Sequence, residues 1–160
     1  MTRVGIGYDS HRYAAGRKMR LGGHAIAHTH GLVGHSDGDA VLHAITDAIL
    51  GAAALGDIGS YFPDDDPQWE GADSTRFVRE AVKAVRANGL TVAHADVTII
   101  AERPKMAPYI GPMRAATAKA LGVPMDHVSI KAKTNEGMGW IGRGEGIAAI
   151  AVVALREDGD

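Results

Sequence analysis

The C-terminal segment of the chain places the strongest constraint on its fold. Residues 147–155 read Ile-Ala-Ala-Ile-Ala-Val-Val-Ala-Leu and are apolar throughout. A strand with one face open to water alternates apolar and polar residues, whereas a strand covered on both faces is continuously apolar. The segment is also too short to span a bilayer. We therefore expect residues 147–155 to form a strand in a sheet whose two faces are both covered.

The rest of the chain alternates between strand-like and helix-like segments. Further strands are expected over residues 2–8, 91–101 and 128–133, with a short hairpin over 18–28 that turns at Gly22-Gly23. Helices are expected from an N-cap at Ser36 to about Leu55, from Asp73 or Ser74 to Asn88-Gly89, and from Pro108 to Leu121-Gly122.

This alternation predicts an α/β fold, built as an α+β sandwich in a single domain over residues 1–160. The expected architecture is a mixed four-stranded sheet with helices packed on one face. A single layer of three helices leaves the second face of the sheet uncovered. Because the strand 147–155 requires a cover there, we expect the chain to self-associate.

Composition excludes several classes of partner. The 160 residues include 17 basic and 19 acidic ones, giving a net charge of −2 and a sequence pI near 6.4. No overall positive field would attract nucleic acid or an anionic membrane surface. The chain has no cysteine, so disulfides and thiolate metal sites are excluded. The first residues lack a signal-peptide pattern, and we expect a cytoplasmic protein.

Asp9, His11 and His43 form a candidate metal site. Asp9 and His11 are two residues apart after the apolar run 4–8, so a strand would place both side chains on the same side. His43 lies in the first expected helix and could supply a third ligand. Two imidazoles and one carboxylate with an open position are typical of a catalytic zinc site. The alternative is a packed His43 that bonds to a helix neighbour.

Two carboxylates accompany His43 on its expected helix. Asp39 and Asp47 lie four residues before and four residues after it, and therefore on roughly the same face. Metal-bound histidines usually donate their other ring N–H to a neighbouring oxygen. We expect one of these carboxylates to orient His43 in this way.

Other segments carry groups suited to a phosphorylated substrate. His35-Ser36 precede the first long helix, where they would bind phosphate or simply cap the helix. The acidic segments 57–59 and 62–66 could hold hydroxyls or a divalent cation, or form a solvated loop. Residues 131–136 end a strand and suit a phosphate with its magnesium ion, although polar strand ends are common. Arg143 could face a symmetry axis, a phosphate or only Glu145.

Taken together, these segments resemble the 2-C-methyl-D-erythritol 2,4-cyclodiphosphate synthases of the non-mevalonate isoprenoid pathway. The matching motifs occur in family order and cover essentially the whole chain. They are residues 5–11 (GIGYDSH), 34–39 (GHSDGD) with His43, 55–59 (LGDIG), 62–67 (FPDDDP), 131–136 (KAKTNE) and 142–147 (GRGEGI). The chain departs from the usual run of threonines at Lys133-Thr134-Asn135, and it has Trp140 where phenylalanine is frequent.

The resemblance implies a metal-dependent phosphorus–oxygen lyase. Its substrate would be 4-diphosphocytidyl-2-C-methyl-D-erythritol 2-phosphate, whose 2-phosphate attacks the β-phosphorus of the diphosphate. The products would be 2-C-methyl-D-erythritol 2,4-cyclodiphosphate and CMP. The resemblance also implies a homotrimer whose sheets face a central cavity and whose active sites lie between subunits. That arrangement agrees with the self-association expected above.

The resemblance also implies roles for individual residues. Asp9, His11 and His43 would hold Zn²⁺ or another divalent transition metal, and Glu136 would hold Mg²⁺ or Mn²⁺ bridging the substrate phosphates. His35 and Thr134 would stabilise the transition state. The implied substrate contacts are Ser36, Asp57, Ile58, Gly59, Phe62, Pro63, Asp64, Asp65, Asp66, Ala101, Lys105, Met106, Ala107, Ala132, Lys133, Trp140 and Arg143.

Two other functions are compatible with the same metal ligands. A zinc-dependent phosphohydrolase of a nucleotide or sugar phosphate would consume water and release two acyclic products. A non-catalytic trimeric module would bind a metal or a cytidine nucleotide without turnover.

Overall fold

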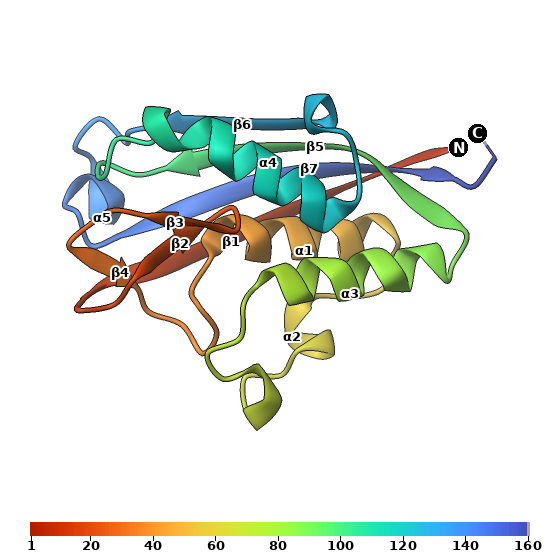
Figure 1. Ribbon diagram of the computed structural model, residues 1–160, viewed down its shortest axis with the longest axis horizontal. Helices are drawn as coiled ribbons and strands as arrows, with labels where there is room; N and C mark the ends of the chain where they lie inside the picture. Colours follow the sequence, from red (N-terminus) through yellow and green to blue (C-terminus); the bar gives the residue numbers. More distant parts are fainter. Residues whose placement is uncertain (160) are drawn as a thin grey trace.

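The computed structural model describes residues 1–159, and in this part of the chain five strands form one mixed sheet (Figure 1). Their order across the sheet is β4 (His30–Leu32), β1 (Thr2–Ala15), β7 (Gly146–Glu157), β5 (Leu90–Ile100) and β6 (Val128–Lys133). Strands β5 and β6 are parallel, and the other neighbouring pairs are antiparallel. The mixed sheet confirms the predicted class of fold.

The prediction of four strands was wrong because it missed β4. This strand has only three residues, too few to show an alternating pattern. Its partner is the far end of β1, where Tyr13 pairs with Leu32. Strand β1 continues to Ala15 instead of ending at Tyr8, so Asp9 and His11 lie inside it.

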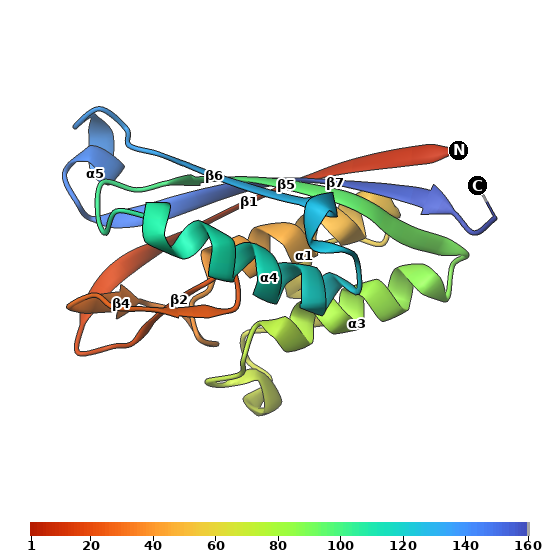
Figure 2. The same ribbon diagram turned by 45° about the horizontal axis from the view of Figure 1, so that its top comes forward.

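Three long helices cover one face of the sheet, and Figure 2 shows them on the same side. They are α1 (Ala40–Ala52), α3 (Thr75–Arg86) and α4 (Ile110–Leu121). The predicted hairpin is present as β2 (Met19–Leu21) and β3 (His24–Ile26). Single-turn helices are α2 (Ile58–Tyr61), η1 (Pro67–Trp69), η2 (Ala107–Tyr109), η3 (Met125–His127) and α5 (Gly139–Gly142). Within residues 1–159 no helix has the length and apolarity needed to cross a bilayer.

The first long helix begins later than predicted. Its N-cap is Asp39, not Ser36, and one carboxylate oxygen of Asp39 accepts the Leu42 N–H at 3.0 Å. The same carboxylate accepts the N–H groups of Gly22 and Gly23 at 2.9 and 2.8 Å. Asp39 is fully buried and joins the helix start to the β2–β3 hairpin. His35 and Ser36 therefore lie in the preceding loop, before the N-cap of the helix.

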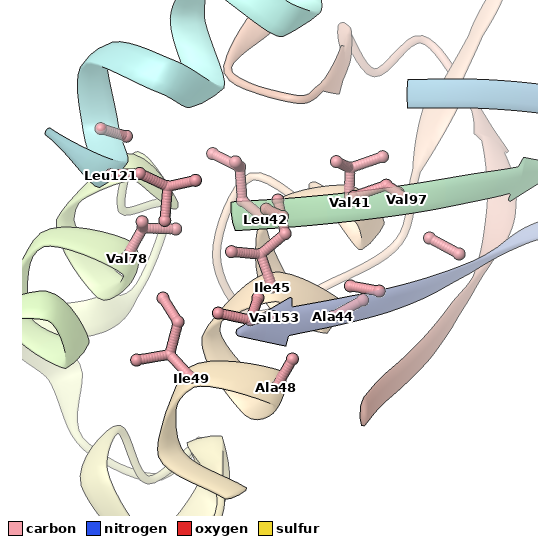
Figure 3. Close-up of a cluster of buried hydrophobic side chains, with 14 of the residues drawn as sticks. Val41, Leu42, Ala44, Ile45, Ala48, Ile49, Val78, Val97, Leu121 and Val153 are labelled. Atoms are coloured by element: carbon pink, nitrogen blue, oxygen red, sulfur yellow. The ribbon is translucent and has the colours of Figure 1, made fainter. Parts of the chain in front are cut away.

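Close contact between β1 and α1 organises the core. Gly5 and Gly7 face the helix, and a Cβ atom on Gly7 would lie 1.9 Å from the Ala44 carbonyl oxygen. A Cβ atom on Gly5 would lie 2.1 Å from the Ala48 carbonyl oxygen. The absence of side chains here lets helix backbone and strand backbone touch. The opposite side of α1 packs apolar side chains into the main core, as Figure 3 shows for residues including Leu42, Ile45 and Ile49.

The sheet face opposite the helices is apolar and open along β1 and β7. Val4, Ile6 and Tyr8 are 64%, 71% and 55% exposed, and Val152 is 38% exposed. Ile6 pairs with Val152 and Tyr8 with Ile150, so these side chains form one continuous patch. Apolar patches of this kind on soluble chains usually mark an interaction surface.

Candidate active site

Three ligand atoms converge where β1 meets the first turn of α1. The His11 Nε2 atom lies 2.6 Å from Asp9 Oδ2 and 3.1 Å from His43 Nδ1, and the latter is 3.2 Å from Asp9 Oδ2. Within residues 1–159, this is the one group of three or more His, Asp or Glu side chains whose ligand atoms converge in this way. The metal-binding triad predicted from the sequence is therefore assembled in the structure.

The local structure explains why these side chains meet. Asp9 and His11 share the β1 face that carries Gly5 and Gly7, because side chains alternate along a strand. That face is turned toward α1. Since the glycines allow the helix to approach closely, His43 from its first turn reaches the same point.

The second ring nitrogen of each histidine contacts an oxygen. His11 donates its Nδ1–H to the Val33 carbonyl at 2.5 Å, which leaves Nε2 free to bind a metal. The Nε2 atom of His43 lies 2.8 Å from Ser74 Oγ and 3.0 Å from Ser36 Oγ. Hydroxyl groups, rather than a helix carboxylate, therefore contact His43.

The prediction that Asp39 or Asp47 orients His43 was wrong. The Asp39 carboxylate instead accepts hydrogen bonds from three backbone N–H groups. Asp47 accepts the Ile58 N–H at 2.8 Å and so anchors α2. Equal spacing on a helix places side chains on one face, but it does not determine which of them touch.

The triad also has a strong internal electrostatic coupling. Burial opposes ionisation of Asp9, but the contacts of its carboxylate with His11 and His43 outweigh burial and lower the pKa of Asp9. Burial likewise opposes the charge on His11, but its hydrogen bond with Asp9 raises the pKa of His11 above its ordinary value. Protons and a cation therefore compete for the same ligand atoms.

A cavity of about 260 Å³ opens beside the triad. Of the predicted substrate and catalytic residues, it is lined by His35, Ser36, Ile58, Gly59, Phe62 and Asp64. Trp69 and Phe77, which sequence reasoning did not assign to the site, form its apolar wall with Phe62. Phe62 is only 6% exposed. Its ring packs edge-to-face against Trp69 and tilted against Phe77, with centroids 5.0 and 4.7 Å away.

A second cavity of about 400 Å³ lies between β6 and the segment that follows β5. It is lined by the remaining predicted nucleotide contacts, Ala101, Lys105, Met106, Ala107, Ala132 and Lys133, together with Thr134. Its lining shares no residue with the cavity beside the triad. One chain therefore brings the predicted residues together as two separate groups, with His35 in one and Thr134 in the other.

Several predicted residues line neither cavity. Asp57 and Asp66 cap short helices, accepting the N–H groups of Ser60 and Gln68. Pro63 and Asp65 are exposed on the loop between them. Trp140 lines a different hollow together with Ser10, His11, Arg12 and Glu145. Arg143 forms an ion pair with Glu145 at 3.0 Å, the simplest of the arrangements expected for it.

Glu102 supports the loop that carries Thr134 and Glu136, and sequence reasoning missed it. Its Oε1 accepts the N–H groups of Asn135 and Gly137 at 2.9 and 3.2 Å. Glu136 itself is exposed, with φ of 53°, a left-handed conformation that costs free energy for a residue with a side chain. Glu102 holds the loop in that conformation from the end of β5. No local pattern links residues 33 positions apart, so the sequence carried no signal for this contact.

The same architecture occurs in known proteins. The sequence model of the YgbB family matches residues 2–156. The chain belongs to the YgbB family. A 2-C-methyl-D-erythritol 2,4-cyclodiphosphate synthase of Cupriavidus metallidurans is 54% identical over 159 residues, which cover 99% of this chain and 95% of that relative.

Solved structures agree with this family. A CDP-bound 2C-methyl-D-erythritol-2,4-cyclodiphosphate synthase superposes with a TM-score of 0.89 at 40% identity, covering 96% of this chain and all of that one. The bifunctional IspDF from Campylobacter jejuni gives a TM-score of 0.94 at 38% identity. The superposition covers 98% of this chain but only 42% of the bifunctional chain.

A bifunctional relative found by sequence is also matched over less than half of its length. The bifunctional enzyme IspD/IspF of Hyphomonas neptunium is 55% identical over 157 residues, but this chain spans only 42% of its length. Family membership confirms the predicted activity: a lyase that forms a cyclic diphosphate in the non-mevalonate isoprenoid pathway. None of the relatives described here supports a phosphohydrolase.

Proposed function

We propose that Asp9, His11 and His43 hold Zn²⁺ and that the chain uses this site to cyclise 4-diphosphocytidyl-2-C-methyl-D-erythritol 2-phosphate. The observation that carries this proposal is the convergence of two imidazole nitrogens and one carboxylate oxygen within 3.2 Å. This donor set suits a divalent transition metal with one position left open. When bound, the cation would neutralise phosphate charge and polarise the phosphorus that is attacked.

The reaction needs no nucleophile from the protein. An oxygen of the substrate 2-phosphate forms a bond to the β-phosphorus while the bond to the CMP oxygen breaks, so both electron pairs stay on substrate groups. The protein then acts by positioning the two phosphates and offsetting their repulsion. We assign these tasks to His35 and Thr134, which would donate toward the transferring phosphoryl group, and to Glu136, which would hold Mg²⁺ or Mn²⁺.

We assign the two cavities to different parts of the substrate. The cavity beside the triad, with its apolar wall and with Asp64 and the hydroxyl of Ser36, suits the methylerythritol portion. The cavity beside β6 is lined by Lys105 and Lys133 and suits the cytidine diphosphate portion. We propose that the predicted contacts that line neither cavity act in the assembled oligomer; they are Asp57, Pro63, Asp65, Asp66, Trp140 and Arg143.

We further propose a homotrimer in which the two cavities of neighbouring subunits form one active site. Two observations support it. The open sheet face carries the apolar patch around Ile6 and Val152. The residues assigned to one reaction are divided between two cavities that share no lining residue. A cytoplasmic location stays a prediction, which cell fractionation would check.

The reaction is tested by phosphorus NMR of the substrate incubated with the protein, zinc and magnesium. We expect CMP and a cyclic diphosphate in equal amounts. Asp9→Ala should lose both zinc binding and turnover, because it removes the ligand that contacts both histidines. Hydrolysis to CMP and an acyclic bisphosphate would contradict the cyclisation. A folded, zinc-loaded protein that binds the nucleotide without turnover would favour a binding module.

The shared active site is tested by mixing two inactive variants. Asp9→Ala disables the half-site of the triad, and Thr134→Ala disables the half-site beside β6. If each site combines halves from two subunits, co-expression at equal levels should restore about one quarter of the wild-type activity, because both halves of some sites are then intact. A site built within one chain would give no recovery.

A further inference from the structure

The orientation of His43 depends on which of its ring nitrogens carries the proton. A neutral imidazole has one N–H and one bare nitrogen, and only the bare nitrogen binds a metal. His43 Nδ1 points at Asp9 and His11, whereas Nε2 points at Ser74. A contact that keeps the proton on Nε2 would therefore leave Nδ1 bare and able to bind a metal.

The hydroxyl of Ser74 has a single proton, and Asp37 takes it. Ser74 Oγ donates to Asp37 Oδ1, and an ionised carboxylate can only accept. Ser74 Oγ then has no proton left for His43 and can only accept from it. The contact of 2.8 Å between Ser74 Oγ and His43 Nε2 must be a hydrogen bond donated by His43.

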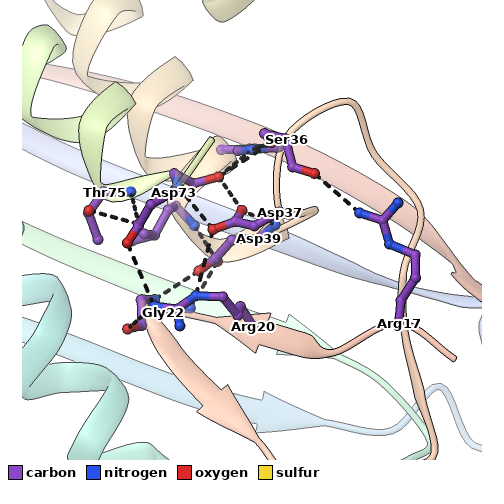
Figure 4. A network of polar contacts seen from close by, with 12 residues as sticks. Arg17, Arg20, Gly22, Ser36, Asp37, Asp39, Asp73 and Thr75 are labelled. Atoms are coloured by element: carbon purple, nitrogen blue, oxygen red, sulfur yellow. Dashed lines mark hydrogen bonds and ion pairs between the residues drawn. The ribbon is translucent and has the colours of Figure 1, made fainter. Parts of the chain in front are cut away.

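Asp37 is held in place by further donors. Its Oδ2 accepts the Ser74 N–H at 3.0 Å, and its Oδ1 accepts the Asp39 N–H at 3.1 Å. The guanidinium Nε of Arg20 lies 3.7 Å from Oδ2 and forms an ion pair with this carboxylate. Figure 4 shows Asp37 between Ser36 and Asp39, with Arg20 reaching it from the β2–β3 hairpin.

Ser74 is not needed to start its helix. It is the N-cap residue of α3, yet its side chain makes no capping bond. The neighbouring Asp73 accepts the Thr75 N–H at 2.9 Å instead. Ser74 is fully buried, and its hydroxyl is used by Asp37, by His43 and by a long contact of 3.5 Å with Ser36.

We propose that Asp37 and Ser74 are positioning residues that fix the tautomer and ring orientation of His43 and so set the metal affinity of the triad. This inference rests on the metal site of the proposed function. Within residues 1–159 the Ser36 hydroxyl contacts no carboxylate, so it can donate to His43 as well as accept from it. Ser36 alone therefore cannot fix the tautomer.

The test compares Ser74→Ala with Thr75→Ala. Both variants remove one hydroxyl from the start of α3, but among residues 1–159 the Thr75 hydroxyl bonds only to Asp73. Zinc affinity is measured by competition with a chromophoric chelator, and thermal unfolding of the zinc-free proteins is measured alongside. We expect Ser74→Ala to bind zinc about 10- to 100-fold more weakly, as is typical when such a supporting contact is lost. Thr75→Ala should bind zinc as the wild type does.

A spectroscopic measurement separates orientation from stability. Long-range ¹H–¹⁵N correlation spectra of histidine-labelled protein report which ring nitrogen carries the proton. We expect a protonated Nε2 at His43 in the wild type and in Thr75→Ala, and a mixture of tautomers in zinc-free Ser74→Ala. If Ser74→Ala does not fold, Asp37→Asn supplies the same test, because its amide can donate to Ser74 and so frees the serine proton.

The outcomes are distinct. Equal zinc affinity of Ser74→Ala and Thr75→Ala, or an unchanged Nε2 tautomer in Ser74→Ala, would overturn the positioning role of Asp37 and Ser74. Either result would leave the proposed metal site itself uncontradicted. A wild-type protein that binds no zinc in a manner sensitive to Asp9→Ala would instead contradict the proposed function itself.

Discussion

Replacing Gly7 with alanine should damage both the stability of the fold and its metal site. The added Cβ atom would lie 1.9 Å from the Ala44 carbonyl oxygen and 2.9 Å from the Ala48 N atom. Carbon and oxygen atoms that are not bonded need about 3 Å or more, so strand and helix must separate by about 1 Å. The atoms met are backbone atoms, which cannot rotate away. We expect Gly7→Ala to lower the free energy of unfolding by about 3 kcal/mol.

The same displacement should reach the triad. Ala44 follows His43 on α1, and Gly7 precedes Asp9 by two residues on β1. Metal–ligand distances tolerate changes of only about 0.2 Å. A separation of about 1 Å between strand and helix would pull His43 away from Asp9, and we expect zinc affinity to fall by at least about tenfold.

The matched control is Gly51→Ala, on the same helix. Outside its own helical turn, a Cβ atom at Gly51 would meet no atom of the described residues within 4 Å. Alanine is the better helix former, so this variant should gain about 0.5–1 kcal/mol. Urea unfolding at one fixed protein concentration measures both variants, because association makes stability depend on concentration. A Gly7→Ala variant as stable as the wild type would refute the packing argument. A destabilised variant with unchanged zinc affinity would refute the link to the metal site.

Two further predictions concern residues that support the site. Glu102→Ala should lower kcat by about tenfold in steady-state assays, because the loop of Thr134 and Glu136 loses a charge-assisted bond. Glu102→Gln should keep most activity, since its amide oxygen can accept both N–H groups. Equal losses in the two variants would contradict this role of Glu102. Asp39→Asn should cost about 1–3 kcal/mol at pH 7, because one of the three N–H groups that its carboxylate binds loses its acceptor. Burial and the Asp37 carboxylate raise the pKa of Asp39 to about 6. The folded wild type then keeps a proton that the unfolded chain has released, so its stability should fall as pH rises from about 4 to 6. Urea unfolding across this pH range should show that slope for the wild type and not for Asp39→Asn.

The sequence by itself predicted the elements that obey local rules. Strand β6 was expected over residues 128–133, where the structure has it, and the hairpin turn was expected at Gly22-Gly23. Asp9 and His11 were predicted to share one side of a strand because side chains alternate along an extended backbone, and they do. The identity of the metal-binding triad followed from that period together with one helical histidine.

Only the tertiary structure decided which distant groups touch. The Nε2 atom of His43 contacts Ser74, the N-cap residue of α3 31 residues away, and not a carboxylate four residues away. Strand β4 exists because β1 extends far enough to pair with it, and Glu102 reaches a loop 33 residues away. The separation of the predicted site residues into two cavities was likewise set by how strands and helices pack. Local periods determine the direction in which a side chain points, whereas the group that it meets depends on the packing of the whole chain.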